Sequence, residues 1–401
     1  MTAASDEQTD ASADELRNAL ADRLRAHNII RTPAVEKAIR RTARHLFLPG
    51  VPLADAYADH PVAASQPWFV ATMLEQLAVE PGHRVKEVGV GTGYNAALIA
   101  AIAGPTGRVV TIDIDADLVD SARQHLAAAG VDHVEVILGD GALGHRAGGP
   151  YDRIISTVGA YDIPTPWFDQ LATGGRLVVP LRLRGSSSRV IAFERRDDRW
   201  ASVDSQLGVF MPLRGIGDDA RRIVSLTPEP DITLQTHQDQ TVDAPALAGV
   251  LDSTPHQVWT GVVLSGEVSY EWMELWLCLR LDNALMRMNV SPDAAARGQV
   301  APMFAWGSMA TTRGADLIYL TTRPASSDPD GLKLYEVGVI AHGPTSDSLA
   351  HQTNDEIQTW NRDYRTRSVR FELPDTPETA DPTTGRFVLD RPHHPITVIW
   401  D

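Results

Sequence analysis

The stretch that decides the fold is Glu87-Val88-Gly89-Val90-Gly91-Thr92-Gly93, which joins an apolar run to a helix-forming run. Residues 85–90 predict a buried strand, and residues 94–103 predict a helix. The three glycines let the connecting backbone approach a ligand without a Cβ in the way. A dinucleotide fingerprint needs glycine at position 94, which is Tyr94 here. The loop therefore suits a ligand without a pyrophosphate, chiefly S-adenosylmethionine (SAM), although a simple tight turn would also need glycines.

Three acidic residues accompany successive predicted strands. Glu87 precedes the glycines, where a carboxylate can receive the ammonium group of SAM. Asp113 ends the strand predicted over residues 109–114 and lies 113 − 93 = 20 residues after Gly93, the separation expected for a carboxylate that accepts from ribose hydroxyls. Asp140 follows the strand predicted over residues 134–138, where it can accept from an adenine amino group. Each acid alone is also typical of a turn or a helix N-cap, but together they predict a ligand site at the carboxyl edge of a parallel sheet.

The rest of the chain is consistent with two domains. Alternating strands and helices predict an α/β, Rossmann-like, doubly wound sheet preceded by N-terminal helices. We expect a disordered tail over 1–11, a SAM domain over 12–217, a linker over 218–231 and an accessory α+β domain over 232–401. The remaining predicted strands are 153–158, 176–180, 190–195, 205–212, 270–281, 316–322, 333–341 and 397–400, and the further helices are 12–24, 33–44, one from residue 67, 115–129 and 346–361.

Composition excludes several classes of function. The net charge of −16 and the lack of a basic run argue against a nucleic-acid partner. The single cysteine, Cys278, excludes an internal disulfide and is expected to be a buried thiol. The thirteen histidines lack ligand spacing, so we expect no metal. No apolar stretch reaches bilayer-spanning length, and the expected location is the cytoplasm, with no membrane partner.

A series of short motifs extends through the N-terminal half. Besides the glycine loop, they are His45-Leu46-Phe47-Leu48-Pro49, Ser65-Gln66-Pro67, Gly139-Asp140-Gly141, Pro150-Tyr151-Asp152-Arg153-Ile154-Ile155, Gly174-Gly175-Arg176-Leu177-Val178-Val179-Pro180 and Phe210-Met211-Pro212-Leu213. In this order and spacing they resemble the protein-L-isoaspartate O-methyltransferase family from about residue 44 to residue 215. The resemblance implies a SAM-dependent O-methyltransferase that esterifies a carboxylate and releases S-adenosyl-L-homocysteine. The expected cofactor-binding residues are Glu87, Gly89, Gly91, Thr92, Gly93, Asp113, Asp140 and Gly141.

The expected acceptor site lies just before the helix that begins at residue 67. In the family a serine of this loop contacts the reacting carboxylate, which implies that role for Ser65; its alternative role is to cap the helix. Ala63 and Ala64 stand where the family has threonine and isoleucine. We expect these two alanines, with Gln66 and Tyr94, to face the substrate, a peptide or protein that carries Asp or isoAsp.

The chain continues well beyond the point where ordinary repair enzymes of the family end. In this it resembles long actinobacterial members associated with ribosomally synthesised, post-translationally modified peptides such as lanthipeptides and graspetides. That resemblance favours esterification of an aspartate in a macrocyclic peptide, after which the ester collapses to aspartimide. Residues 232–401 would recognise the peptide. Two alternatives stay open: repair of isoaspartyl damage, and a SAM-binding scaffold without catalysis.

Overall fold

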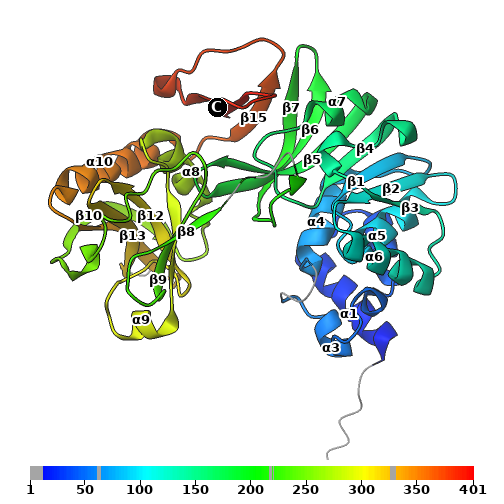
Figure 1. The fold of residues 1–401 in the computed structure, drawn as a ribbon, viewed down its shortest axis with the longest axis horizontal. Helices are drawn as coiled ribbons and strands as arrows, with labels where there is room; N and C mark the ends of the chain where they lie inside the picture. Colours follow the sequence, from blue (N-terminus) through cyan, green and yellow to red (C-terminus); the bar gives the residue numbers. More distant parts are fainter. Residues whose placement is uncertain (1–11, 61–64, 216–218, 220, 326–330) are drawn as a thin grey trace, which may run out of the picture. The chain divides into compact units, whose positions relative to one another are not determined.

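The computed structural model describes residues 12–60, 65–215, 219, 221–325 and 331–401. The chain divides into two compact units (Figure 1). The first unit comprises Met1–Pro180, Val190–Gln206 and Phe210–Asp218, and the second comprises Leu181–Arg189, Leu207–Val209 and Asp219–Asp401. The tail expected over residues 1–11 lies outside the described residues.

Helices form the N-terminal part of the first unit. They are α1 (Ala13–Ala26), α2 (Pro33–Arg41), the 3-10 turn η1 (Arg44–Phe47), α3 (Leu53–Ala56) and α4 (Pro67–Leu77). Ser12 begins α1 with a capping box that includes Glu15, and the Thr32 side chain accepts from the backbone N–H of Val35 at the start of α2. The second helix ends at Arg41, earlier than the expected residue 44, so Arg44 begins a separate turn.

A parallel sheet forms the centre of the first unit. Its strands are β1 (Arg84–Val88), β2 (Arg108–Asp113), β3 (Val134–Leu138), β4 (Tyr151–Ser156) and β5 (Leu171–Arg184), followed by β6 (Ser187–Arg196) and β7 (Arg199–Leu207); the helices are α5 (Tyr94–Ala103), α6 (Ala116–Ala128) and α7 (Thr165–Asp169), with short 3-10 turns η2 (Gly141–Leu143) and η3 (Arg146–Gly148). The order β3-β2-β1-β4-β5 is parallel throughout. Strand β1 therefore has β2 on one side and β4 on the other, which makes its carboxyl end the switch point where doubly wound sheets bind ligands. The Rossmann-like prediction is confirmed.

The helix after the glycine loop is buried on almost every side. Eight of the ten residues of α5 are buried, and the helix contacts β1, β2 and β3. It shares one hydrophobic core with buried residues of α1, α2 and α4. The N-terminal helices and the sheet thus hold the glycine loop between packed elements, and this rigidity suits a binding site.

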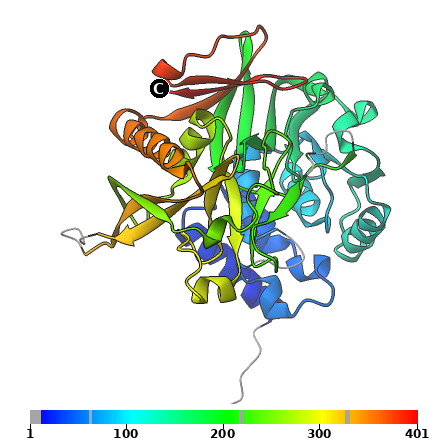
Figure 2. The same cartoon turned by 60° about the vertical axis from the view of Figure 1, so that its left-hand side comes forward.

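The second unit contains an antiparallel sheet. The elements of the whole unit are β8 (Arg222–Ser225), β9 (Ile232–Thr236), β10 (His256–Ser265), α8 (Glu271–Arg280), β11 (Met286–Val290), α9 (Pro292–Ala296), β12 (Gly307–Arg313), β13 (Asp316–Pro324), β14 (Leu334–His342), α10 (Ser346–Thr359), the π turn Trp360–Tyr364, β15 (Val369–Pro374), β16 (Arg386–Leu389) and β17 (Ile396–Trp400); β15, β16 and β17 are not part of this antiparallel sheet. The sheet has the order β10-β14-β13-β12-β11-β9-β8. Helix α10 packs against β10, β13 and β14 (Figure 2). Strands β13, β14 and β17 and helix α10 confirm predicted elements.

Three expectations about local structure are wrong. Residues 270–281, predicted as a strand, contain the helix α8, because a helix that is buried on nearly all sides has the same continuous apolar run as a buried strand. Residues 222–225, predicted within a linker, form β8 and pair with β9. Residues 205–212 were expected to form one strand, but β7 ends at Leu207.

Cys278 lies in α8 and is fully buried, as expected. Burial raises the pKa of its thiol to about 12, which keeps it protonated. Among the described residues, none of the helices is both long and apolar enough to cross a bilayer.

Candidate functional site

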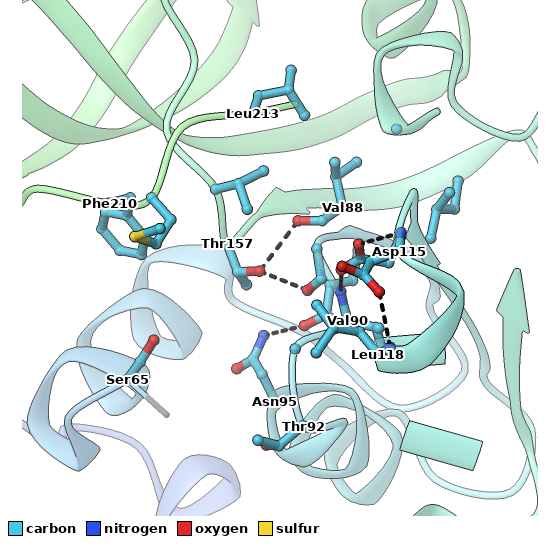
Figure 3. A pocket seen from close by; sticks show the side chains of 18 of the residues that line it. Ser65, Val88, Val90, Thr92, Asn95, Asp115, Leu118, Thr157, Phe210 and Leu213 are labelled. Atoms are coloured by element: carbon cyan, nitrogen blue, oxygen red, sulfur yellow. Dashed lines mark hydrogen bonds between the residues drawn. The ribbon is translucent and has the colours of Figure 1, made fainter. Parts of the chain in front are cut away.

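A cavity of about 720 Å³ lies at the carboxyl ends of β1, β2 and β4 in the first unit (Figure 3). This volume is typical of small-molecule sites. The wall is built from the glycine loop, the end of β2, the residues after β4, the start of α4 and the segment from Phe210 to Arg214. In Figure 3, Ser65 lies on one side and Asp115 on the other, with Thr157 and Asn95 between them. These five segments, together with Arg44 and Gly141, therefore meet at the predicted edge of the sheet.

The glycine loop forms one wall of the cavity. Gly89 has φ 95°, and a Cβ added to it would lie 2.6 Å from Thr157 Oγ1. The Thr157 hydroxyl lies 2.7 Å from the carbonyl oxygen of Gly89, to which it donates, and this fixes the loop to the end of β4. Gly91 and Thr92, both expected to bind the cofactor, also line the cavity. Gly93 lies behind the wall as the N-cap of α5, where a Cβ would meet Ala122 and Leu126 of α6, so its contribution is to helix packing.

Glu87 lies at the end of β1 and is completely buried. Its two carboxylate oxygens accept hydrogen bonds from Asn95 Nδ2 at 2.7 Å and Thr111 Oγ1 at 2.6 Å. Burial raises the pKa of Glu87 to about 7, and the nearby charge of Asp113 acts in the same direction. The expected ammonium acceptor is thus already engaged by two side chains. The NH₂ group of Asn95 points to Glu87, and Asn95 is itself one of the residues that line the cavity.

Asp113 ends β2, and its side chain, expected to accept from ribose hydroxyls, belongs to a residue that lines the cavity. One of its oxygens accepts from the backbone N–H of Val90 at 3.0 Å, and the other accepts from that of Asp115 at 3.1 Å. Arg214 lies 3.6 Å from Asp113 and 3.2 Å from Asp115. The guanidinium of Arg214 is half exposed, so these ion pairs are weak and a ligand hydroxyl can displace them.

Asp140 and Gly141, which are adjacent in the chain, differ in their relation to the cavity. Gly141 lines the cavity, whereas Asp140 does not. The Asp140 side chain caps the turn η2 by accepting from the Ala142 N–H at 2.9 Å. A Cβ on Gly215 would lie 2.3 Å from Asp140 Oδ2, so this carboxylate faces Gly215. Asp140, expected to accept from an adenine amino group, is therefore not among the residues that line the cavity.

Ser65 and Tyr94 both line the cavity on the expected acceptor side, and Gln66 does not. Gln66 is instead the N-cap residue of α4, and its side-chain oxygen accepts from Trp68 Nε1 at 3.0 Å. The backbone N–H of Trp68 donates to Asp59 at 3.3 Å. Asp59 therefore takes the capping role that was the alternative for Ser65, whose side chain makes no cap hydrogen bond in the described structure. Ala63 and Ala64 lie outside the described residues.

Sequence reasoning missed several residues of the wall, among them Arg44, Asn95, Asp115 and Thr157. Asn95 lies two residues after Gly93, so its position close to the glycine loop was a usable signal. Arg44 and Thr157 carry no local signal, because only the tertiary fold brings them to the cavity. Among the described residues, no three His, Cys, Asp or Glu side chains are grouped to hold a metal ion.

Comparisons with known proteins match this half of the chain. Residues 15–216 match the family model described as protein-L-isoaspartate(D-aspartate) O-methyltransferase. The chain is 41% identical over 216 residues to protein-L-isoaspartate O-methyltransferase 2 of Archaeoglobus fulgidus. This match covers 50% of this chain and 94% of that protein. A solved protein-L-isoaspartate O-methyltransferase has a TM-score of 0.47 at 20% identity and covers 89% of this chain and 96% of its own. The solved structure of a putative protein-L-isoaspartate O-methyltransferase from Plasmodium falciparum, in complex with S-adenosyl-L-homocysteine, has a TM-score of 0.43 at 20% identity; the match covers 49% of this chain and 98% of that chain.

Proposed function

Because the chain belongs to the protein-L-isoaspartate(D-aspartate) O-methyltransferase family, we propose that its first unit methylates the carboxylate of an isoaspartyl residue, using SAM. The enzyme class and the cofactor follow from the family. The observation that carries the proposal is the cavity at the switch point of the sheet, which joins the glycine loop and Asp113 to Ser65 in one wall.

The residues present fit SAM. Gly91 lines the cavity with no described atom within 4 Å of the position of its missing Cβ, which leaves the loop backbone open to a ligand there, and Asp113 offers a carboxylate for ribose hydroxyls. The partly exposed side chains of Ile114 and Leu118 supply an apolar wall beside Asp113, which suits an adenine ring. When bound, SAM supplies an activated methyl group on a sulfonium.

The chain's own contribution to catalysis is alignment. An isoaspartyl carboxylate is ionised near neutral pH, so the reaction needs no general base. The chain must place the acceptor oxygen in line with the methyl carbon and the sulfur, and this positioning alone can supply a large rate acceleration. The hydroxyl of Ser65 lies at the cavity wall, and we assign it the role of donor to the acceptor carboxylate.

Replacing Ser65 with alanine should lower kcat/KM for an isoaspartyl peptide by about tenfold, because the variant loses one hydrogen bond to a charged oxygen. Steady-state assays with varied peptide would measure this change. The affinity for S-adenosylhomocysteine, measured by calorimetry, should stay within about twofold of the wild-type value. An unchanged kcat/KM would contradict the acceptor role of Ser65.

A second candidate acceptor is an aspartate in a macrocyclic peptide. The observation that favours it is the second unit, whose largest part, Asp219–Asp401, follows the end of the family match at residue 216. The methyl ester would expel methanol when the following backbone nitrogen attacks it, and this closes aspartimide. We propose that the second unit recognises such a peptide, as an extension of the isoaspartyl activity.

Three peptides of one sequence would test the two acceptors: a linear isoaspartyl form, a linear aspartyl form and a macrocyclic aspartyl form. Each would be incubated with the full chain and SAM and followed by mass spectrometry. The family activity predicts rapid methylation of the linear isoaspartyl form. A mass lower by one water on the macrocyclic form alone would support the second candidate. No methyl transfer to any of the three would contradict both.

A further inference from the structure

Arg44 is a buried cation in the wall of the cavity that also contains Ser65. It begins η1 and is 1% exposed. Its Nε donates to the carbonyl oxygen of Ala56 at 2.9 Å, and its Nη2 donates to that of Ser65 at 2.9 Å. Its guanidinium lies over the ring of Tyr94, 4.9 Å from the centroid. These three contacts fix the plane of the guanidinium.

The third nitrogen of this group, Nη1, has no hydrogen-bond partner in the part of the chain that the structure describes. Among the described residues that line the cavity, it is the one buried side-chain nitrogen or oxygen without a partner. A buried donor left unpaired is costly, and a buried charge without a counter-charge is more costly still. Burial lowers the pKa of Arg44, and the nearby Tyr94, Tyr57 and Asp59 offset only part of this effect.

We propose that Arg44 Nη1 is the carboxylate-binding donor of this cavity, an inference that rests on the proposed function. A carboxylate is the ligand group that supplies both the missing acceptor and the missing negative charge. Two carboxylates enter such a site during the reaction: the methionine carboxylate of SAM and the acceptor carboxylate of the peptide. The same nitrogen can serve either one, so the experiment must separate the two sources.

The test compares the wild type with Arg44→Met, which keeps the length of the stem and removes the charge. Arg153→Met is the matched control, because Arg153 also donates to carbonyl oxygens, those of Leu77 and Ala78, but does not line the cavity. Calorimetry would measure the affinity for S-adenosylhomocysteine and for 5′-deoxy-5′-methylthioadenosine, which lacks the amino-acid group. Steady-state assays would measure KM for an isoaspartyl peptide.

Loss of a charge-assisted hydrogen bond should cost about 10- to 100-fold in the parameter that depends on it. If Arg44 binds the methionine carboxylate, Arg44→Met weakens S-adenosylhomocysteine by that factor and leaves methylthioadenosine unchanged. If Arg44 binds the acceptor, KM for the peptide rises by that factor while both nucleoside affinities hold. Arg153→Met should change none of these values.

Two results would overturn the proposal. One is an Arg44→Met chain with unchanged ligand affinities and an unchanged KM. The other is an equal loss of affinity for both nucleosides, which would mean that Arg44 only supports the shape of the cavity. A wild-type chain that binds S-adenosylhomocysteine but methylates no peptide would contradict the proposed function while leaving the nucleoside test of Arg44 valid.

Discussion

Replacing Asp113 with asparagine is expected to weaken S-adenosylhomocysteine binding by about 100-fold or more. Asparagine has no charge, so the hydrogen bonds that two ribose hydroxyls would donate to the Asp113 carboxylate become weaker or are lost. Hydrogen bonds to a charged group contribute about 1.5–3 kcal/mol each. The new amide would also turn an NH₂ group toward one of the backbone N–H groups that now donate to Asp113, those of Val90 and Asp115. Calorimetry with the full chain would measure the affinity.

A ligand that lacks one ribose hydroxyl distinguishes two causes of weaker binding in Asp113→Asn: loss of ribose recognition and distortion of the glycine loop. The wild type should bind 2′-deoxy-S-adenosylhomocysteine much more weakly than S-adenosylhomocysteine, whereas Asp113→Asn should bind both with similar, low affinity. Asp120→Asn is the matched control, because Asp120 is an acid of α6 that does not line the cavity. If Asp113→Asn still distinguishes the two ligands as the wild type does, the ribose role of Asp113 is wrong.

Replacing Lys86 with methionine is expected to stabilise the first unit at neutral pH by about 4 kcal/mol. Lys86 is completely buried in β1, and burial lowers its pKa from 10.5 to about 7. Its Nζ donates to Gln170 Oε1 at 2.8 Å, and that oxygen also accepts from the His145 N–H at 2.9 Å. The substitution therefore removes a costly buried amine without leaving Gln170 Oε1 unpaired.

The sign of the pH dependence follows from the lowered pKa. Between about pH 7 and pH 10.5 the unfolded chain holds the proton of Lys86 and the folded chain does not, so wild-type stability rises with pH in this window. Below about pH 7 the full penalty is present. The advantage of Lys86→Met should thus shrink to about 1 kcal/mol near pH 9.5. The raised pKa of Glu87 makes stability fall as pH rises, but this effect is the same in the wild type and in Lys86→Met, so it does not change the difference between them.

Urea denaturation of wild type and variant near pH 6.5 and near pH 9.5 would measure the difference in unfolding free energy. Lys37→Met is the control, because Lys37 is exposed on α2 and its replacement should leave the pH dependence unchanged. A Lys86→Met chain that is no more stable near pH 6.5 than the wild type would show that the amine is not buried as a costly group.

The elements around the glycine loop could be predicted because their signals are local. Glycines at 89, 91 and 93 sit at positive φ, and the alternation of apolar strands and helices placed Asp113 at the end of β2. The α8 prediction failed because the apolar residues from Leu275 to Leu279 carry no periodicity that separates a buried helix from a buried strand. Local pattern thus predicts an element best where one of its faces is polar.

The sequence by itself determined the Rossmann-like sheet, the family and most of the residues that form the glycine-loop wall. These depend on residues close together in the chain, where backbone geometry and hydrophobic periodicity act directly. Only the tertiary structure decided that Asp140 faces Gly215, that Asn95 and Thr111 occupy Glu87, and that Arg44 has an unpaired donor. The physical reason is that hydrogen-bond partners and burial depend on contacts between distant segments, which the order of residues does not specify locally.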